Sequence, residues 1–318
     1  MVARRISALR LPAFELAGFR PLAGSAGLAL GVWLLAALSL ITAATAQDPQ
    51  TAFSFEDLPP LPAQGPRIEE VLPVRSPAGD LLGATWLDGR SPRRLAVAFA
   101  PWNGAAWGPR EPVAPPAAGS QLALTATATR DGDVLLAWSA FDGEDDEILW
   151  SRRAGTAWST PARLAADNGV PDITPALFTP PRTDRSQALA AWSRYQDGQY
   201  RVVLSRFDGR SWSEPVILGP AGSVFPSFAA SPASRGTRLL FRTARPRGWR
   251  VVELDPGGRP RRAAQALTGE RQLPRPEIQE TEAGLRFSWQ GFEAGESGEP
   301  ATEEPATWIL RVPWESLP

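Results

Sequence analysis

The sequence predicts an all-β chain, a five-bladed β-propeller of four-stranded blades, on three observations. Apolar segments centred on an aromatic residue recur about every fifty residues, as at Trp138 and Trp192, and a second apolar segment follows each about 13 residues later. Turn glycines come next, at positions 104, 155, 209 and 258. Residues after 46 show no helical period of apolar side chains. A period near fifty with several short strands is typical of propeller blades.

The first 46 residues have the pattern of an export signal. Four arginines precede an uncharged stretch at 21–46, and Ala44-Thr45-Ala46 ends it with small residues suited to cleavage. This order of regions is typical of a secretory signal peptide. The alternative is an uncleaved signal anchor, because the uncharged run is long enough to span a bilayer. Either way, the rest of the chain is predicted to be periplasmic or secreted, exported from a bacterial cytoplasm.

The composition excludes several kinds of chemistry. All 33 basic residues are arginine, and the chain has no His, no Cys and one Met. Disulfides, thiol nucleophiles, imidazole bases and Cys- or His-ligated metal or haem sites are therefore excluded, and we expect no cofactor. Residues 47–318 carry 29 basic and 33 acidic side chains, a net charge of −4. This balance disfavours nucleic acids and anionic membranes as partners.

Residues 47–66 form a proline-rich segment before the repeats. Within it, Thr51-Ala52-Phe53-Ser54 is similar to Thr156-Ala157-Trp158-Ser159, which belongs to the outer strand of a repeat. We predict that this segment closes the ring by supplying the outer strand of the last blade. The alternative is a simple linker.

Residues 67–318 are predicted to form five repeats of about fifty residues. Each has an inner strand A, a strand B with a central aromatic, a strand C and an outer strand D. The repeats begin near Arg67, Ser120, Pro171, Val224 and Arg275, and the fifth lacks residues for a D strand. We expect Trp138 and Trp192 on strand B to be buried between neighbouring blades.

The turn between strands C and D resembles the Asp-box (BNR) repeat of sialidase-like propellers. Ser151-x-x-x-Gly155-x-x-Trp158 and Ser205-x-x-x-Gly209-x-x-Trp212 are similar to the family motif Ser/Thr-x-Asp-x-Gly-x-x-Trp. The Asp position holds Trp102, Arg153, Phe207 and Pro256 in the four copies, so all are degenerate. The resemblance implies a propeller whose turn glycines have φ > 0 and whose indoles pack between sheets. It implies no ligand, because Asp-boxes lie on the outer rim.

The resemblance brings no sialidase catalytic set to this chain. That family uses an arginine triad, a tyrosine activated by a glutamate and an aspartate acid/base on the inner strands. Here Tyr195 and Tyr200, the two tyrosines, flank a hairpin turn, and there is no Phe/Tyr-Arg-Ile-Pro segment. We therefore assign no catalytic residue on this basis.

An alternative is a glycoside hydrolase of the sialidase/arabinanase propeller type that uses inner-strand carboxylates. The candidates are Glu69 and Glu277, which follow Arg67 and Arg275, and Asp172 at the start of the third repeat. Neighbouring inner strands can hold two carboxyl groups roughly 5–10 Å apart, as glycosidases require. The competing interpretation is that these side chains line a water-filled channel, and adjacent arginines disfavour a protonated carboxyl.

The B-to-C hairpins form the predicted binding surface. Its candidate residues are the aromatics Phe141, Tyr195, Trp249 and Phe292 and the arginines Arg194 and Arg245. Such aromatics would stack on sugar rings. Otherwise they are cross-strand pairs that stabilise the hairpins.

The acidic run Glu144-Asp145-Asp146-Glu147 offers oxygen ligands for Ca²⁺, but its spacing matches no calcium loop, so we predict no metal site. Together these features predict an exported, non-catalytic, sialidase-like propeller that binds a polysaccharide or an extracytoplasmic protein. A membrane is expected as a partner only with an uncleaved signal.

Overall fold

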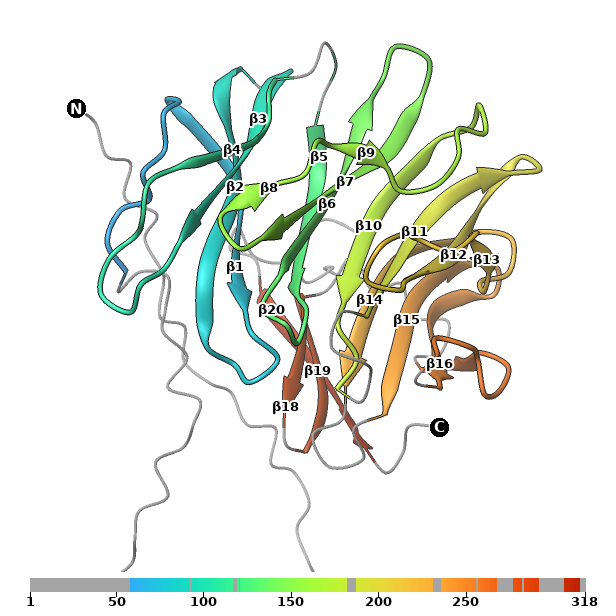
Figure 1. Ribbon diagram of the computed structural model, residues 1–318. Helices are drawn as coiled ribbons and strands as arrows, with labels where there is room; N and C mark the ends of the chain where they lie inside the picture. Colours follow the sequence, from blue (N-terminus) through green and yellow to red (C-terminus); the bar gives the residue numbers. More distant parts are fainter. Residues whose placement is uncertain are drawn as a thin grey trace, which may run out of the picture. The chain divides into compact units, whose positions relative to one another are not determined.

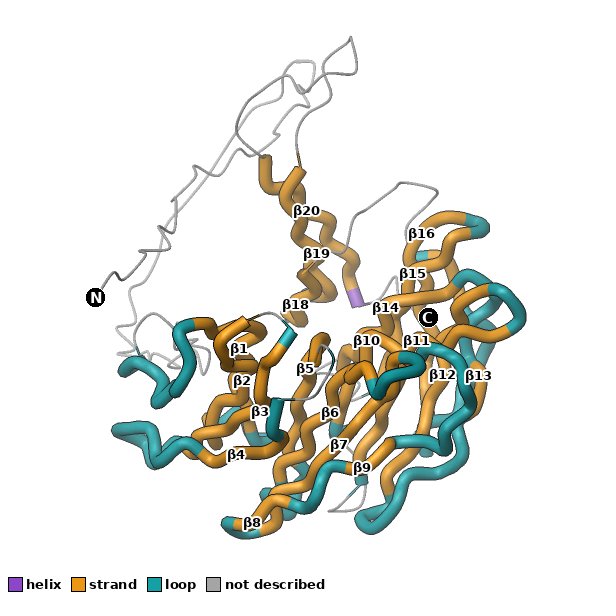
Figure 2. The backbone as a smooth tube through the Cα atoms, turned by 90° about the horizontal axis from the view of Figure 1, so that it is seen from above, coloured by secondary structure: helices purple, strands orange, loops and turns teal. Residues whose placement is uncertain are grey.

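The computed structural model describes residues 58–91, 93–116, 119, 121–181, 187–230, 236–255, 257–267, 277–281, 283–291 and 306–314. These residues hold twenty β-strands and no α-helix, and the short helical segment drawn in Figure 2 is a 3₁₀ turn at Trp314. They belong to one compact unit, Ser54–Pro318. Within the described ranges no helix is long and apolar enough to cross a membrane. The predicted export signal and the segment 51–54 lie outside the described residues.

The strands form five antiparallel sheets, in which strands that follow one another along the chain are neighbours, except that β9 pairs with β7 (Figure 1). We call these sheets blades 1 to 5. Blade 1 contains β1 (Arg67–Arg75), β2 (Leu81–Ser91), β3 (Arg94–Pro101) and β4 (Glu111–Ala114). Blade 2 contains β5 (Gln121–Ala128), β6 (Val134–Phe141), β7 (Asp146–Ala154), β8 (Ala157–Trp158) and β9 (Ala162–Arg163).

The remaining blades follow the same order. Blade 3 contains β10 (Asp172–Phe178), β11 (Ala188–Gln196), β12 (Gln199–Phe207) and β13 (Val216–Ile217). Blade 4 contains β14 (Ser223–Ala230), β15 (Thr237–Ala244), β16 (Arg247–Leu254) and β17 (Gln265–Ala266). Blade 5 has three strands among the described residues, β18 (Glu277–Thr281), β19 (Gly284–Gly291) and β20 (Ala306–Pro313).

The all-β prediction and the four-stranded sheets are confirmed. The inner strands β1, β5, β10, β14 and β18 begin within two residues of the predicted repeat starts. Five blades in a closed ring stay a prediction, because blade 5 is described only in part.

The core lies between neighbouring sheets. The strand-B aromatics Trp86, Trp138, Trp192, Phe241 and Phe287 are fully buried. Trp138 belongs to a cluster with Leu95, Val97 and Phe99 of blade 1, and Trp192 to one with Leu135 and Ala137 of blade 2. Both tryptophans thus pack between blades, as predicted.

The inner strands share a bulge that the sequence did not reveal. Glu70, Ala123, Thr174 and Phe225 have φ between 50° and 56°, and each lies where the pairing of strands A and B shifts register. Positive φ is uncommon for residues with a Cβ atom. The Glu70 carboxylate accepts the N–H groups of Ala123, at 2.9 Å, and Leu124, at 2.5 Å, and so joins the bulges of blades 1 and 2.

The C-to-D turns of blades 3 and 4 each bind an arginine of the preceding blade. The glycines of the C-to-D turns, at 104, 155, 209 and 258, have φ between 61° and 100°, as the turn requires. Arg152 on β7 donates to the Gly209 carbonyl of blade 3 at 2.7 Å, and Arg206 on β12 donates to the Gly257 carbonyl of blade 4 at 3.0 Å. The same arginine position therefore links successive blades.

Residues 58–66 cover one face of blade 1. Leu61 and Ala63 pack against a cluster that contains Trp86, and Trp107 donates its indole N–H to the Pro59 carbonyl at 2.7 Å. Because side chains alternate between the two faces of a strand, this face lies opposite the one that packs on blade 2. The ring-closing role of residues 51–54 stays a prediction.

We predict that replacing Trp138 or Trp192 with Ala destabilises the protein by about 3–5 kcal/mol, because each leaves a cavity between two sheets. Urea denaturation followed by circular dichroism measures this loss. The control is Phe141→Ala, since Phe141 is 39% exposed. A tryptophan variant as stable as the control would place that indole outside the interface.

Candidate functional site

The inner-strand glutamates begin strands of blades 1 and 5. Arg67 and Glu69 form an ion pair in which the Arg67 side chain is 50% exposed and Glu69 27%. Glu277 is the first residue of β18 and pairs with Ser288, but its side chain and all of Arg275 lie outside the described residues. The proposed approach of Glu69 and Glu277 therefore stays a prediction.

Asp172 is part of a buried ion pair. Its side chain is 1% exposed and faces Arg194, which donates from Nε to Oδ1 at 3.0 Å and from Nη2 to Oδ2 at 2.7 Å. The guanidinium also lies 5.6 Å from the centre of the Trp192 ring. This corrects the expectation that Asp172 lines an open channel, because its side chain is buried. Arg194 holds a carboxylate of its own blade, and its contact with a ligand stays a prediction.

Two hairpin aromatics lie on the surface as expected. Phe141 is 39% exposed and Tyr195 37%, and each lies at or next to the end of strand B, three residues after the core tryptophan. The Tyr195 ring meets the ring of Tyr200, its cross-strand partner, edge to face at 5.2 Å. Tyr195 is thus exposed, as a sugar-stacking residue would be, and it also forms a cross-strand pair that stabilises the hairpin. Both interpretations of the sequence therefore apply to it.

The other hairpin candidates differ from the expectation. Trp249 is 2% exposed and packs against Phe287 of blade 5, with ring centres 6.1 Å apart. It is therefore a core residue, because its position in β16 points it between blades 4 and 5. Arg245 is exposed in the short turn before β16. Phe292 lies outside the described residues.

Carboxylates gather at the tip of the β6–β7 hairpin. The Asp142 carboxylate contacts Arg163 Nη2 at 2.5 Å, and Arg163 also reaches Asp167 at 3.1 Å. Glu147 is almost fully buried, and burial raises its pKa to about 7, with further contributions from the negative charges of Asp172 and Asp145. Glu147 is therefore able to hold a proton near neutral pH.

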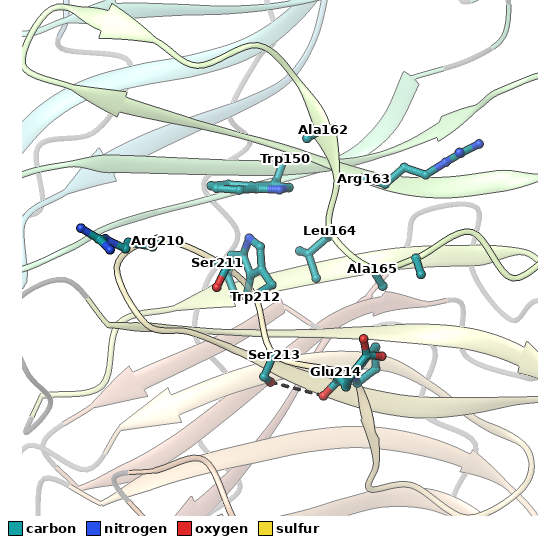
Figure 3. A pocket seen from close by; sticks show the side chains of 12 residues that line it. Trp150, Ala162, Arg163, Leu164, Ala165, Arg210, Ser211, Trp212, Ser213 and Glu214 are labelled. Atoms are coloured by element: carbon teal, nitrogen blue, oxygen red, sulfur yellow. Dashed lines mark hydrogen bonds between the residues drawn. The ribbon is translucent and has the colours of Figure 1, made fainter.

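A groove of about 380 Å³ runs between blades 2 and 3 (Figure 3). Trp150 of β7 and Trp212 of the next blade's C-to-D turn form its aromatic walls, and their rings meet edge to face at 5.8 Å. Both indoles are half-buried. Arg163, Arg210 and Glu214 add charged groups to the lining. The groove thus combines apolar ring surface with hydrogen-bonding groups.

A second hollow, of about 270 Å³, lies where the inner strands end. Arg75, Thr127, Arg130, Phe178 and Thr179 contribute to its lining. The Thr127 and Thr179 hydroxyls are 3.1 Å apart. Because Asp172 at the other end of β10 pairs with Arg194 beside the hairpins, this hollow lies at the end of the blades away from the hairpin aromatics.

Sequence reasoning missed the groove and the burial of Glu147. It assigned the Asp-box-like Trp212 to packing alone and gave Trp150 no role beyond strand C. The available signal was the recurrence of tryptophan beside both C-to-D turns, at positions 150 and 158 in one repeat and 212 in the next. Burial of Glu147 depends on residues 163–172, which approach from another part of the chain.

No protein-family model matches the sequence, and no curated protein matches it. Among solved structures, a protein of unknown function from Dyadobacter fermentans has 11% identity and a TM-score of 0.41, covering 77% of this chain and 94% of that one. A GH43 endo-arabinanase from Bacillus licheniformis has 11% identity and a TM-score of 0.39, covering 80% and 97%.

The GH43 protein BlXynB from the same Bacillus has 9% identity and a TM-score of 0.35, and the alignment covers 54% of this chain and 37% of that protein. These values describe a distant likeness of backbone path and carry no information on chemistry.

We predict that Asp172→Ala or Arg194→Ala destabilises the protein by about 3–5 kcal/mol, because each leaves a buried charge without its partner. The Asp172→Ala/Arg194→Ala double variant should lose less than the sum of the two. Urea denaturation at neutral pH provides the measurement. Arg67→Ala, which removes an exposed pair, should change stability by less than about 1 kcal/mol. Equal effects of Asp172→Ala and Arg67→Ala would contradict a structural role for the buried pair.

Proposed function

We propose that this protein is an exported, non-catalytic β-propeller that binds glycans in the groove between blades 2 and 3. The observation that carries the proposal is the lining of this groove, where Trp150 and Trp212 lie beside Arg163, Arg210 and Glu214. Sugar rings present apolar C–H faces and polar hydroxyl edges. Aromatic walls suit the faces, and charged side chains suit the hydroxyls.

The hairpin aromatics extend this surface. Arg163 lines the groove, and its guanidinium contacts Asp142, the residue that follows the exposed Phe141. The groove therefore leads towards the blade 2 hairpin, at which Phe141 is exposed. A chain of several sugars fits such a path better than a single monosaccharide, which supports a polysaccharide as the ligand.

The state of the inner-strand carboxylates favours binding over hydrolysis. Asp172 is buried against Arg194, and Glu69 is paired with Arg67. A glycosidase needs one carboxyl group free to give a proton and a second nearby to act as base or nucleophile. The alternative function is a glycoside hydrolase that uses Glu69 and Glu277. The experiment below also tests for hydrolysis.

Export is supported by the N-terminal pattern of arginines, apolar residues and Ala-x-Ala. N-terminal sequencing of protein recovered from culture medium or a periplasmic extract tests it directly. We expect a mature chain that begins at Gln47.

We predict that Arg210→Ala combined with Glu214→Gln weakens polysaccharide binding at least tenfold and leaves thermal stability unchanged, because both side chains are exposed at the groove. Calorimetry or affinity electrophoresis on a panel of neutral and acidic polysaccharides measures the binding. Arg259→Ala is a matched control, since Arg259 follows the equivalent turn glycine of blade 4.

A second arm combines Phe141→Ala and Tyr195→Ala, which should weaken binding of long chains more than of short oligosaccharides. Binding unchanged in the groove variant would exclude the groove. Hydrolysis by the wild type that disappears in Glu69→Gln/Glu277→Gln would establish the hydrolase instead. Retention on a protein partner but on no glycan would assign the surface to protein binding.

A further inference from the structure

Three carboxylates at the tip of the β6–β7 hairpin are spaced for a metal ion. Asp142, Asp145 and Glu147 each offer one oxygen, and the three oxygens lie within 4.8 Å of one another. Oxygens bound to one Ca²⁺ lie about 2.3–2.6 Å from the ion, so two of them are at most about 5 Å apart. The three side chains therefore need little movement to share a cation.

Glu147 lacks the hydrogen bond that its burial demands. Its side chain is 2% exposed, and its Oε1 atom is buried without a hydrogen-bond donor. The Arg163 Nε atom is 4.0 Å away, too far for a hydrogen bond. A buried carboxylate oxygen without a donor is costly. A bound cation would provide the missing partner inside the cluster.

The hairpin turn holds the other two ligands in place. Asp142 Oδ1 accepts the backbone N–H groups of Glu144 at 2.9 Å and Asp145 at 3.3 Å, and the Asp142 N–H donates to the Asp145 carbonyl at 3.1 Å. Gly143, at φ 119°, allows this tight turn. The Asp142 and Asp145 backbones are thus fixed relative to each other before any ion binds.

The charges around the cluster favour a divalent cation. Asp142, Asp145, Glu147 and Asp167 bring four carboxylates, while Arg163 contacts two of them and approaches a third. The negative charge of the nearby Asp172 is balanced by its ion pair with Arg194. The Arg163 side chain is 40% exposed, so water can solvate its guanidinium when an ion takes its place at Asp142.

We propose that Asp142, Asp145 and Glu147 form a binding site for a divalent cation of the calcium type, each supplying one carboxylate oxygen. An all-oxygen donor set suits this hard ion, and its flexible coordination leaves positions for water or backbone carbonyls. The site goes beyond glycan binding and stands independently of it. Its effect is to fix the β6–β7 hairpin turn, because all three ligands belong to residues 142–147.

We predict that the full chain, freed of metal by a chelator, binds one Ca²⁺ with a Kd between about 0.1 and 1 mM, the range of extracellular calcium modules. Calorimetry in physiological salt measures the affinity, and the melting temperature should rise with added CaCl₂. Glu147→Gln and Asp145→Asn should each weaken binding at least tenfold. Because Asp145 is less buried than Glu147, its variant tests the site even where the Glu147 change perturbs the fold.

Glu144→Gln is the matched control, since it removes an exposed carboxylate of the same turn that is outside the ligand set. It should bind Ca²⁺ as the wild type does. The proposal is overturned by an absence of saturable binding or by unchanged binding in both Glu147→Gln and Asp145→Asn. A loss of binding in Glu144→Gln equal to that in Asp145→Asn would also overturn it, because this would indicate diffuse attraction to an acidic surface.

Discussion

Burial of the strand-B aromatic of blades 2 to 5 between neighbouring sheets is the constraint on which the rest of the structure depends. In β6 every residue from Val134 to Ala140 is buried, so the strand presents apolar groups on both faces. Exposure of either apolar face of such a sheet to water is unfavourable, so each face must pack against another part of the protein. The packing of Trp138 and Trp192 therefore fixes which blades are neighbours and which part of each strand lies at the contact.

That packing also creates the groove. Trp150 belongs to strand C of blade 2, while Trp212 belongs to the outer turn of blade 3. The two rings meet because the sheets are adjacent, and Phe207 fills the space behind them, 5.4 Å from Trp150. The binding surface that we propose is thus a property of two repeats in contact and is absent from either repeat alone.

The fold was readable from the sequence because its signals are local. Aromatics, turn glycines and apolar runs recur at fixed spacing, and each marks its own strand or turn. The inner-strand bulges had no such signal. Glu70, Ala123, Thr174 and Phe225 share no chemical property, so tertiary packing, not local preference, imposes their positive φ.

The candidate site was harder to predict from the sequence, because its contacts arise only in the folded structure. Trp249 was placed on the surface because it lies in the B-to-C hairpin of the fourth repeat. That hairpin is shorter, however, and the alternation of β16 directs this indole inward. Likewise, Arg194 and Asp172 are 22 residues apart, and only the pairing of β10 with β11 shows that they neutralise each other.

The arginine contacts between blades affect how the protein responds to extremes of pH. Arg152, Arg153 and Arg206 link neighbouring sheets through Gly209, Glu111 and Gly257. Because the chain has neither lysine nor histidine, every side-chain cation in such a link is a guanidinium, which keeps its proton in alkali strong enough to discharge an amine. Two of these three links end on backbone carbonyls, which do not titrate, and only the link through Glu111 has a carboxylate partner. The cationic side of the junctions between blades is thus tolerant of base.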